Sequence, residues 1–479
     1  MKTRSLPLIS RLCILFIFVL CGSSAGAADT AEITADPGLL RHPPLKFEVP
    51  QTERTVLKNG LTVHVIQDRE LPLVRVTALI RAGSAYDPPG KEGLAEVAAA
   101  VLRTGGAASL GGDRIDEKLD HSAAIVSFAA GLDACTGSVN AHRDHFPEVF
   151  ALFADMVRNP AFDERKLSIA RDLKIEALRR IQDDPQKTAF REFRGIVYRG
   201  NPRGRLATIR SVGSIRRDDL VRFHAERFGP ENMLIAVTGD ISRDEAVKLV
   251  ERRFGDWRRK PAPVSEPAPP RPASQGAVYL IEKAVPQSTI ILGYAVPGKS
   301  SPDFYALSVL DFLLGSGGFN SRLTAEIRNR RGLSYSTGSF YSAHGAYGTV
   351  QAYSITNTAS TAEVLQAIGE ILDSLRGKGI TEQELAWAKS SINNSFVFEL
   401  ETAEQIAAET LRVEFYGLPS DFLSSFRDRI EKVTSGDVRQ SAVRHLPPAG
   451  AIILIVGNES DFGKPVSPSG GVTRMKEHF

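Results

Sequence analysis

The chain has 479 residues, of which 42% are apolar, 24% are charged and three are cysteines. At about 100 to 200 residues per domain, this length predicts two to four domains, each large enough to bury a core. The 59 basic residues nearly balance the 56 acidic ones. This balance argues against a nucleic-acid-binding or polybasic membrane-binding protein, and the ordinary apolar content excludes a disordered or fibrous chain.

The first 27 residues have the features of a secretory signal peptide. The basic residues Lys2, Arg4 and Arg11 precede an apolar run over Leu12–Cys21, and small residues follow up to Ala27. Such a run is too short to span a bilayer comfortably, and no other stretch approaches about 20 continuous apolar residues. We therefore expect an exported, periplasmic protein that is cleaved after Ala27 and has no membrane span in its mature form.

The mature chain keeps one cysteine. Cys13 and Cys21 leave with the signal peptide, so Cys135 has no partner for an intramolecular disulfide, and no catalytic thiol motif surrounds it. A lipid anchor on Cys21 is disfavoured, because Leu20 stands where a small residue is required.

In chain order, the first elements alternate between strands and helices. A hairpin is predicted over Thr55–Ile66 with its turn at Asn59-Gly60, and a strand over Val74–Arg81. Apolar residues at i, i+3, i+4, i+7 and i+8 predict an amphipathic helix over Gly93–Arg103. A second long helix begins after Asp163, a good N-cap, and stops before Asp183-Asp184-Pro185.

A proline-rich linker at 258–276 separates a first domain (46–257) from a second (277–462), and the two domains look alike. Val212, Ser214 and His224 recur as Val433, Ser435 and His445, each 221 residues later, and strand-like runs follow both sets (Met233–Gly239 and Ala451–Gly457). In the second domain we likewise predict a strand over Ser288–Ala295 and helices over Phe304–Leu314 and Ser321–Arg331. We predict an α+β fold of two homologous α/β-sandwich domains, formed by internal duplication, with helices on one face of each sheet.

Two strings of residues carry a resemblance to a known family. The first is Gly93-Leu94-Ala95, followed by the helix positions 96–100. The second is the glycine turn Gly315–Gly318 with Ser321-Arg322-Leu323, then Glu326-Ile327-Arg328 and Gly332-Leu333-Ser334-Tyr335. Over residues 46–462 this arrangement resembles the pitrilysin, insulinase and mitochondrial processing peptidase family of zinc peptidases, in which two such domains form a half-clamshell.

The resemblance also shows what this chain lacks. The family binds zinc through His-x-x-Glu-His on the first helix and a distal Glu, because neutral imidazoles and a carboxylate leave one metal position open for water. Here Glu96 and Ala100 replace the two histidines, Ala99 replaces the general base, and Glu176 falls at the distal position. We expect no metal site and no cofactor in this chain. Whether Glu96 and Glu176 together bind any cation is left open.

Two of the remaining histidines offer an alternative metal site. His142 and His145 are three residues apart, with Asp133 and Asp144 nearby. No Glu base accompanies the pair, so a polar entry to a helix is the favoured interpretation. The equivalent positions of His224 and His445 favour packing or capping roles.

In family members the arginine and tyrosine at the positions of Arg328 and Tyr335 reach the scissile region of the bound peptide. A guanidinium and a phenol can donate hydrogen bonds to a carbonyl or to the oxyanion formed from it. The glycine turn implies substrate contacts at Gly317, Gly318 and Ser321. Nucleotide binding is excluded because no Lys-Ser/Thr pair follows the glycines.

These residues indicate a non-catalytic subunit of an exported heterodimeric zinc metallopeptidase. A homologous partner with an intact His-x-x-Glu-His motif would supply zinc and base, and this chain would supply Arg328 and Tyr335 to an unfolded peptide. The chain alone is expected to be inactive. The alternative is a structural or binding protein of the same fold that takes no part in proteolysis. A peptidase using an unfamiliar metal site is the weakest possibility.

Overall fold

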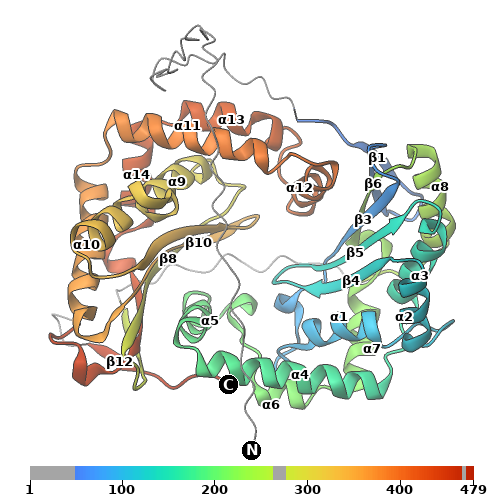
Figure 1. Cartoon of the computed structure of the whole chain (residues 1–479), viewed down its shortest axis with the longest axis horizontal. Coiled ribbons are helices and arrows are strands. Elements are labelled where there is room, and N and C mark those ends of the chain that lie inside the picture. Colours follow the sequence, from blue (N-terminus) through green and yellow to red (C-terminus); the bar gives the residue numbers. More distant parts are fainter. Residues whose placement is uncertain (1–48, 263–276, 467–470) are drawn as a thin grey trace, which may run out of the picture. The chain divides into compact units, whose positions relative to one another are not determined.

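The computed structural model describes residues 49–262, 277–466 and 471–479 (Figure 1). These residues form two mixed six-stranded sheets, each accompanied by helices, which confirms the predicted α+β class. The predicted signal peptide (1–27) lies outside the described residues, as does most of the predicted linker (263–276). No helix in the described part of the chain is long and apolar enough to cross a bilayer.

The first sheet has the strand order β1-β2-β6-β3-β5-β4. Its strands are β1 (Glu53–Val56), β2 (Thr62–Gln67), β3 (Leu73–Ile80), β4 (Ile125–Ala130), β5 (Cys135–His142) and β6 (Met233–Gly239). The predicted hairpin joins β1 to β2, with Gly60 at a φ of 89°, a conformation that glycine adopts without steric cost. β2 and β6 run parallel, and the other neighbours are antiparallel.

The second sheet repeats this arrangement in the order β12-β7-β11-β8-β10-β9. Its strands are β7 (Ala277–Glu282), β8 (Gln287–Pro297), β9 (Ser336–Ala343), β10 (Tyr347–Asn357), β11 (Ile452–Gly457) and β12 (Val472–Arg474). Five strands have the same order and the same directions in both sheets. In the second sheet these are β7, β11, β8, β10 and β9, which correspond in turn to β2, β6, β3, β5 and β4 of the first. The predicted internal duplication is therefore confirmed, and β12 adds an edge strand beyond residue 462.

Two helices of the first half, those predicted over Gly93–Arg103 and after Asp163, begin and end close to the predicted residues. The helices of this half are α1 (Leu94–Thr104), α2 (Gly112–His121), α3 (Phe146–Arg158), α4 (Glu164–Asp183), α5 (Pro185–Val197), α6 (Ile209–Gly213), α7 (Arg217–Arg227) and α8 (Arg243–Phe254). The Asp163 carboxylate accepts a hydrogen bond from the Lys166 amide at 2.9 Å, which is the N-cap that the sequence predicts. The apolar stripe of α1 packs into the core beneath the first sheet.

The helices of the second half are α9 (Phe304–Asp311), α10 (Thr361–Gly377), α11 (Glu382–Phe398), α12 (Ala403–Phe415), α13 (Phe422–Lys432) and α14 (Ser435–His445). Between α9 and β9 the chain forms two π-helices, η5 (Phe312–Ser316) and η7 (Thr324–Arg330), separated by the 3₁₀ turn η6 (Gly318–Asn320). Both π-helices close with wide i to i−5 hydrogen bonds, from Gly317 to Phe312 at 2.8 Å and from Arg331 to Glu326 at 3.0 Å. The sequence predicted helices here but not this wider turn, which often marks a functional segment.

One helix of each half also packs against the sheet of the other half. Phe193 and Ile196 of α5 pack against β8 and β11 of the second sheet, and Leu411 and Phe415 of α12 pack against β3 and β6 of the first (Figure 1). The prediction of helices on a single sheet face was therefore incomplete. Periodicity identifies the apolar face of a helix, but it does not identify the sheet on which that face packs.

A buried polar network joins the two halves. The Asp133 carboxylate, in the turn between β4 and β5, accepts hydrogen bonds from Arg203 at 3.0 Å, Tyr347 at 2.6 Å and Tyr416 at 3.2 Å. The Arg203 guanidinium is only 2% exposed and lies over the Tyr347 ring, 3.7 Å from its centre. A buried carboxylate and a buried guanidinium are tolerated only when they are paired in this way.

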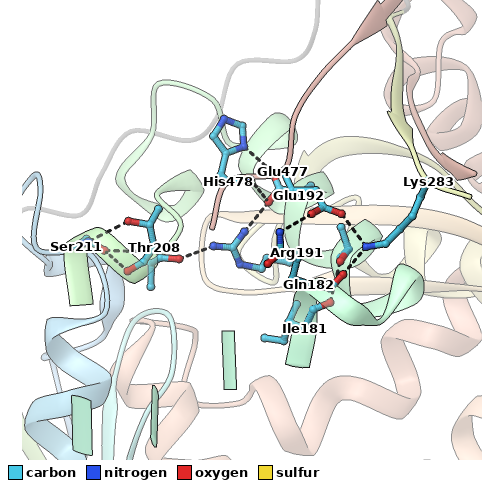
Figure 2. Close-up of polar contacts among 11 residues, drawn as sticks. Ile181, Gln182, Arg191, Glu192, Thr208, Ser211, Lys283, Glu477 and His478 are labelled. Carbon is cyan, nitrogen blue, oxygen red and sulfur yellow. Dashed lines mark hydrogen bonds and ion pairs between the residues drawn. The ribbon is translucent and has the colours of Figure 1, made fainter. Parts of the chain in front are cut away.

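The last described residues fold back onto α5 (Figure 2). His478 donates its backbone amide to Glu192 at 3.1 Å, and its ring Nδ1 lies 2.6 Å from the same carboxylate, which is 1% exposed. Glu477 pairs with Lys283 at 2.8 Å. The segment that follows β12 is therefore fixed to both halves of the chain.

The equivalent histidines lie in the last turns of α7 and α14. His224 Nε2 contacts the Val157 carbonyl at 2.8 Å, and its Nδ1 accepts from Arg259 at 2.7 Å, which is the pattern of a neutral imidazole. His445 Nε2 lies 2.7 Å from Asp303, at the start of α9. Both contacts agree with the packing and capping roles that the sequence favours.

We expect Asp133→Asn to destabilise the fold strongly, by about 3–5 kcal/mol, because it removes the negative charge that faces the buried Arg203 guanidinium. Urea unfolding followed by circular dichroism measures this change. The control is Glu117→Gln, which removes an exposed i,i+3 pair with Arg114 and should leave the midpoint unchanged. Equal midpoints for the two variants would show that the network does not hold the halves together.

His224 should make the fold sensitive to acid. Burial, with the nearby Arg259 charge, lowers its pKa from 6.5 to about 4, so the unfolded chain binds the proton first as the pH falls from about 6.5. Acidification from pH 7 to 4 should therefore cost about 3 kcal/mol of unfolding free energy through this group. His224→Gln, which keeps a donor and an acceptor, should flatten the pH dependence relative to the wild type. Identical slopes for the two proteins would contradict this assignment.

Candidate functional site

The lead-in to α1 is held by a buried carboxylate. Gly93 has a φ of 98°, and the Asp87 carboxylate accepts hydrogen bonds from the amides of Gly93 at 2.7 Å and Ala95 at 2.8 Å. Burial, with smaller contributions from the charges of Glu96 and Glu92, raises the pKa of Asp87 to about 7, although the two amides oppose the shift. The first turn of α1 is therefore held by hydrogen bonds to the Asp87 carboxylate.

The carboxylate at the first motif position is paired with a lysine ammonium. Glu96 of α1 forms an ion pair and hydrogen bond with Lys174 of α4. Ala99 is buried in the core, and Ala100 is exposed at the helix surface. Neither alanine offers a ligand atom or a base, so the charge of Glu96 is balanced from within the protein.

Glu176 lies on α4, two residues after Lys174. Its carboxylate contacts Arg180 at 3.3 Å and Arg179 at 3.9 Å on its own helix. Lys174 and Glu176 are two residues apart on α4, so their side chains leave the helix in roughly opposite directions. The Glu176 carboxylate is therefore paired on its own helix, and Lys174 is the residue of α4 that pairs with Glu96.

The zinc that the family resemblance implies therefore does not fit these residues. Among residues 49–262, 277–466 and 471–479 no group of three or more His, Cys, Asp or Glu side chains is placed to hold a metal ion. His142 ends β5 and His145 precedes α3, with ring centres 6.2 Å apart. Cys135 is fully buried, and burial raises its pKa to about 12, so it is not a nucleophile.

The glycine turn is organised by Ser321. This side chain is completely buried, and its hydroxyl donates to the Gly318 carbonyl at 2.7 Å and contacts the Thr324 hydroxyl at 3.1 Å. Gly318 has a φ of 75° and is exposed, and Gly317 is half-buried. Of the three predicted substrate contacts, the two glycines present backbone at the surface, whereas the Ser321 hydroxyl is directed into the turn.

Arg328 and Tyr335 lie together at the surface. The guanidinium carbon of Arg328 is 4.2 Å from the centre of the Tyr335 ring, and Tyr335 is 82% exposed. The guanidinium also lies 4.8 Å from the Phe319 ring, which is 65% exposed. Sequence reasoning missed Phe319. The signal was a large aromatic residue directly after the glycines, in a turn where a polar residue is usual.

Arg328 differs from the arginines around it. Arg322 is bound by both oxygens of Glu384 at 2.9 and 3.0 Å, and Arg331 by Glu326 at 2.6 Å. Arg330 also pairs with Glu326. Within the described part of the chain Arg328 has no hydrogen-bond or ion-pair partner and makes only the two ring contacts. Its N–H groups are therefore available to a ligand.

Comparison with known proteins identifies the family of this chain. A family model described as insulinase (peptidase family M16) matches residues 62–208, and one described as peptidase M16 inactive domain matches residues 214–392. The chain is 32% identical over 313 residues to an uncharacterized zinc protease of Mycobacterium leprae, covering 61% of this chain and 69% of that protein. It is 22% identical to the mitochondrial-processing peptidase subunit beta of Bos taurus, covering 86% and 85% of the two chains.

Among solved structures, a peptidase M16 inactive domain from Pseudomonas fluorescens superposes with a TM-score of 0.77 at 24% identity, covering 85% of this chain and 98% of that one. This similarity confirms the fold. Together with the family models and the mycobacterial relative, it shows that the chain belongs to peptidase family M16.

The purified chain should bind no stoichiometric zinc, because Lys174 neutralises Glu96 and the alanines offer no ligand. Metal analysis after dialysis measures this, and about one tightly held zinc per chain would refute it. A graft provides the sharper test. Glu96→His, Ala99→Glu and Ala100→His together, with Glu176 at the distal position, should bind zinc only when Lys174→Ala is added, since the ammonium otherwise repels the metal. Zinc binding by the graft with Lys174 intact would show that the ammonium does not prevent metal binding.

Proposed function

We propose that this chain is the non-catalytic subunit of an exported heterodimeric zinc metallopeptidase, paired with a homologous chain that carries His-x-x-Glu-His. One observation carries the proposal: within the described residues the chain keeps an unpaired Arg328 beside an exposed Tyr335, while Glu96 is paired with Lys174. A protein with only an architectural role has no chemical need for an unpaired guanidinium beside an exposed phenol. Export rests on the signal-like residues 1–27.

Arg328 and Tyr335 would act on the peptide carbonyl. The guanidinium N–H groups and the phenol O–H can donate hydrogen bonds to the scissile carbonyl oxygen, and these bonds strengthen as negative charge develops on that oxygen. In this proposal the metal and the general base belong to the partner. The contribution of this chain is differential binding of the transition state.

The first sheet offers a second contact for a peptide. β4 is an edge strand paired on one side with β5, and α1 packs beside it. Ile125, at the start of β4, is 62% exposed. An exposed edge accepts an extended peptide as an additional strand, through main-chain hydrogen bonds that are independent of sequence. This geometry favours unfolded peptides, because a folded protein does not present a free extended segment.

Peptide hydrolysis should appear only when this chain is mixed with its motif-bearing partner. In that mixture Tyr335→Phe should lower kcat about a hundred- to a thousandfold, the cost of losing one oxyanion donor, and should change KM less. Assays of each chain and of the mixture on an unstructured peptide, with size-exclusion chromatography to verify the complex, measure both effects. The matched control is Tyr279→Phe, a tyrosine on β7 that also lies under an arginine, 5.5 Å from Arg199.

Two outcomes would oppose the proposal. Full activity of the partner alone would show that this subunit is dispensable for catalysis. If the complex forms but Tyr335→Phe stays within about twofold of wild type, the chain has the architectural or binding role that is the alternative.

A further inference from the structure

Phe319 and Tyr335 enclose the guanidinium of Arg328. The two rings contact the same guanidinium carbon, at 4.8 Å and 4.2 Å, and they come from two segments on either side of the π-helix η7. Both rings are more than half exposed. They form an aromatic clamp, by which we mean Phe319, Arg328 and Tyr335 together.

Phe319 is held in this exposed position by the turn around it. Gly318 takes its left-handed φ of 75° directly before Phe319, and the buried Ser321 anchors the turn directly after it. The Asn329 amide donates to the Phe319 carbonyl at 3.3 Å, tying the turn to η7. A phenylalanine side chain that is 65% exposed loses most of the stabilisation that burial provides, so core packing does not account for it.

The aromatic clamp can hold the Arg328 guanidinium in place without using its N–H donors. Carboxylates hold the neighbouring Arg322 and Arg331, but each such contact uses the N–H donors of the guanidinium. Aromatic rings hold a guanidinium through its faces, by cation–π contact, and leave the N–H groups in its plane free. Two aromatic rings can therefore order an arginine and leave its N–H donors unused, whereas a carboxylate orders the arginine by using those donors.

We propose that Phe319 is a positioning residue that orders Arg328 for the substrate through its ring face. This inference rests on the proposed function and deepens it. Phe319 makes no bond to the reacting atoms, and it acts by limiting the orientations of the guanidinium.

The clamp itself is tested on the isolated chain, without a partner or an activity. Protons above the face of an aromatic ring resonate upfield, so the Nε–H signal of Arg328, assigned with Arg328→Lys, reports both rings by NMR. Phe319→Leu keeps apolar bulk but has no π face, and it should move this signal downfield, whereas Phe319→Tyr should leave it in place. An unchanged signal in Phe319→Leu would overturn the clamp.

The positioning role is tested in the reconstituted complex. Phe319→Leu and Phe319→Ala should lower kcat about two- to fivefold with little change in KM, as expected for one exposed cation–π contact, and Phe319→Tyr should restore wild-type turnover. In an Arg328→Ala background Phe319→Ala should have no further effect. Phe398→Ala is the control, since Phe398 is similarly exposed, at 68%, at the end of α11.

The outcomes separate this inference from the proposed function. If Phe319→Ala still lowers kcat in the Arg328→Ala background, Phe319 does not act through Arg328 and the inference fails. The inference also fails if Phe319→Ala lowers kcat but Phe319→Leu does not. If Arg328→Ala retains full turnover, the proposed function fails and the positioning role fails with it, whatever the NMR signal shows. If Arg328→Ala is impaired and Phe319→Leu is not, only the inference fails.

Discussion

The fold depends on one buried carboxylate, that of Asp133. It accepts hydrogen bonds from Arg203 of the first half and from Tyr347 and Tyr416 of the second. Tyr347 begins β10 and Tyr416 ends α12, so the network lies where elements of the two halves meet. Because a buried charge is stable only with all its partners in place, the network fixes the register between the halves more strictly than apolar packing does.

The helices α5 and α12 also join the two halves, through apolar packing. Each half covers the second face of the other's sheet, so neither sheet has its full packing without the other half. Glu414 of α12 adds a contact, pairing with Arg54 and His64 at 2.8 Å each, and these bonds, that of Arg54 foremost, lower the pKa of Glu414 to about 2. The surfaces that carry Glu96 and Arg328 are therefore set by one cooperative unit rather than by two independent domains.

Two charges in this protein are held by opposite means, and the contrast explains the site. Glu96 forms an ion pair with Lys174, so its negative charge is already balanced. Arg328 is contacted by two aromatic rings, so its N–H groups still lack a hydrogen-bond acceptor among the described residues. Among the described residues, the negative charge of Glu96 is thus balanced by Lys174, whereas the Arg328 guanidinium keeps hydrogen-bond donors that are suited to a carbonyl oxygen.

The sequence by itself determined the elements that local rules govern. Asn59-Gly60 predicted the hairpin, Asp163 the start of α4, and the 221-residue spacing the duplication, because turns, caps and periodicity depend on neighbours in the chain. The missing motif residues at 96, 99 and 100 were also evident from sequence. Only the tertiary structure decided that Lys174 pairs with Glu96, that α5 and α12 each pack on the sheet of the other half, and that Phe319 lies against Arg328. These contacts join residues distant in sequence or set apart by a π-helix, and their partners are selected by packing and charge in three dimensions, which no local pattern encodes.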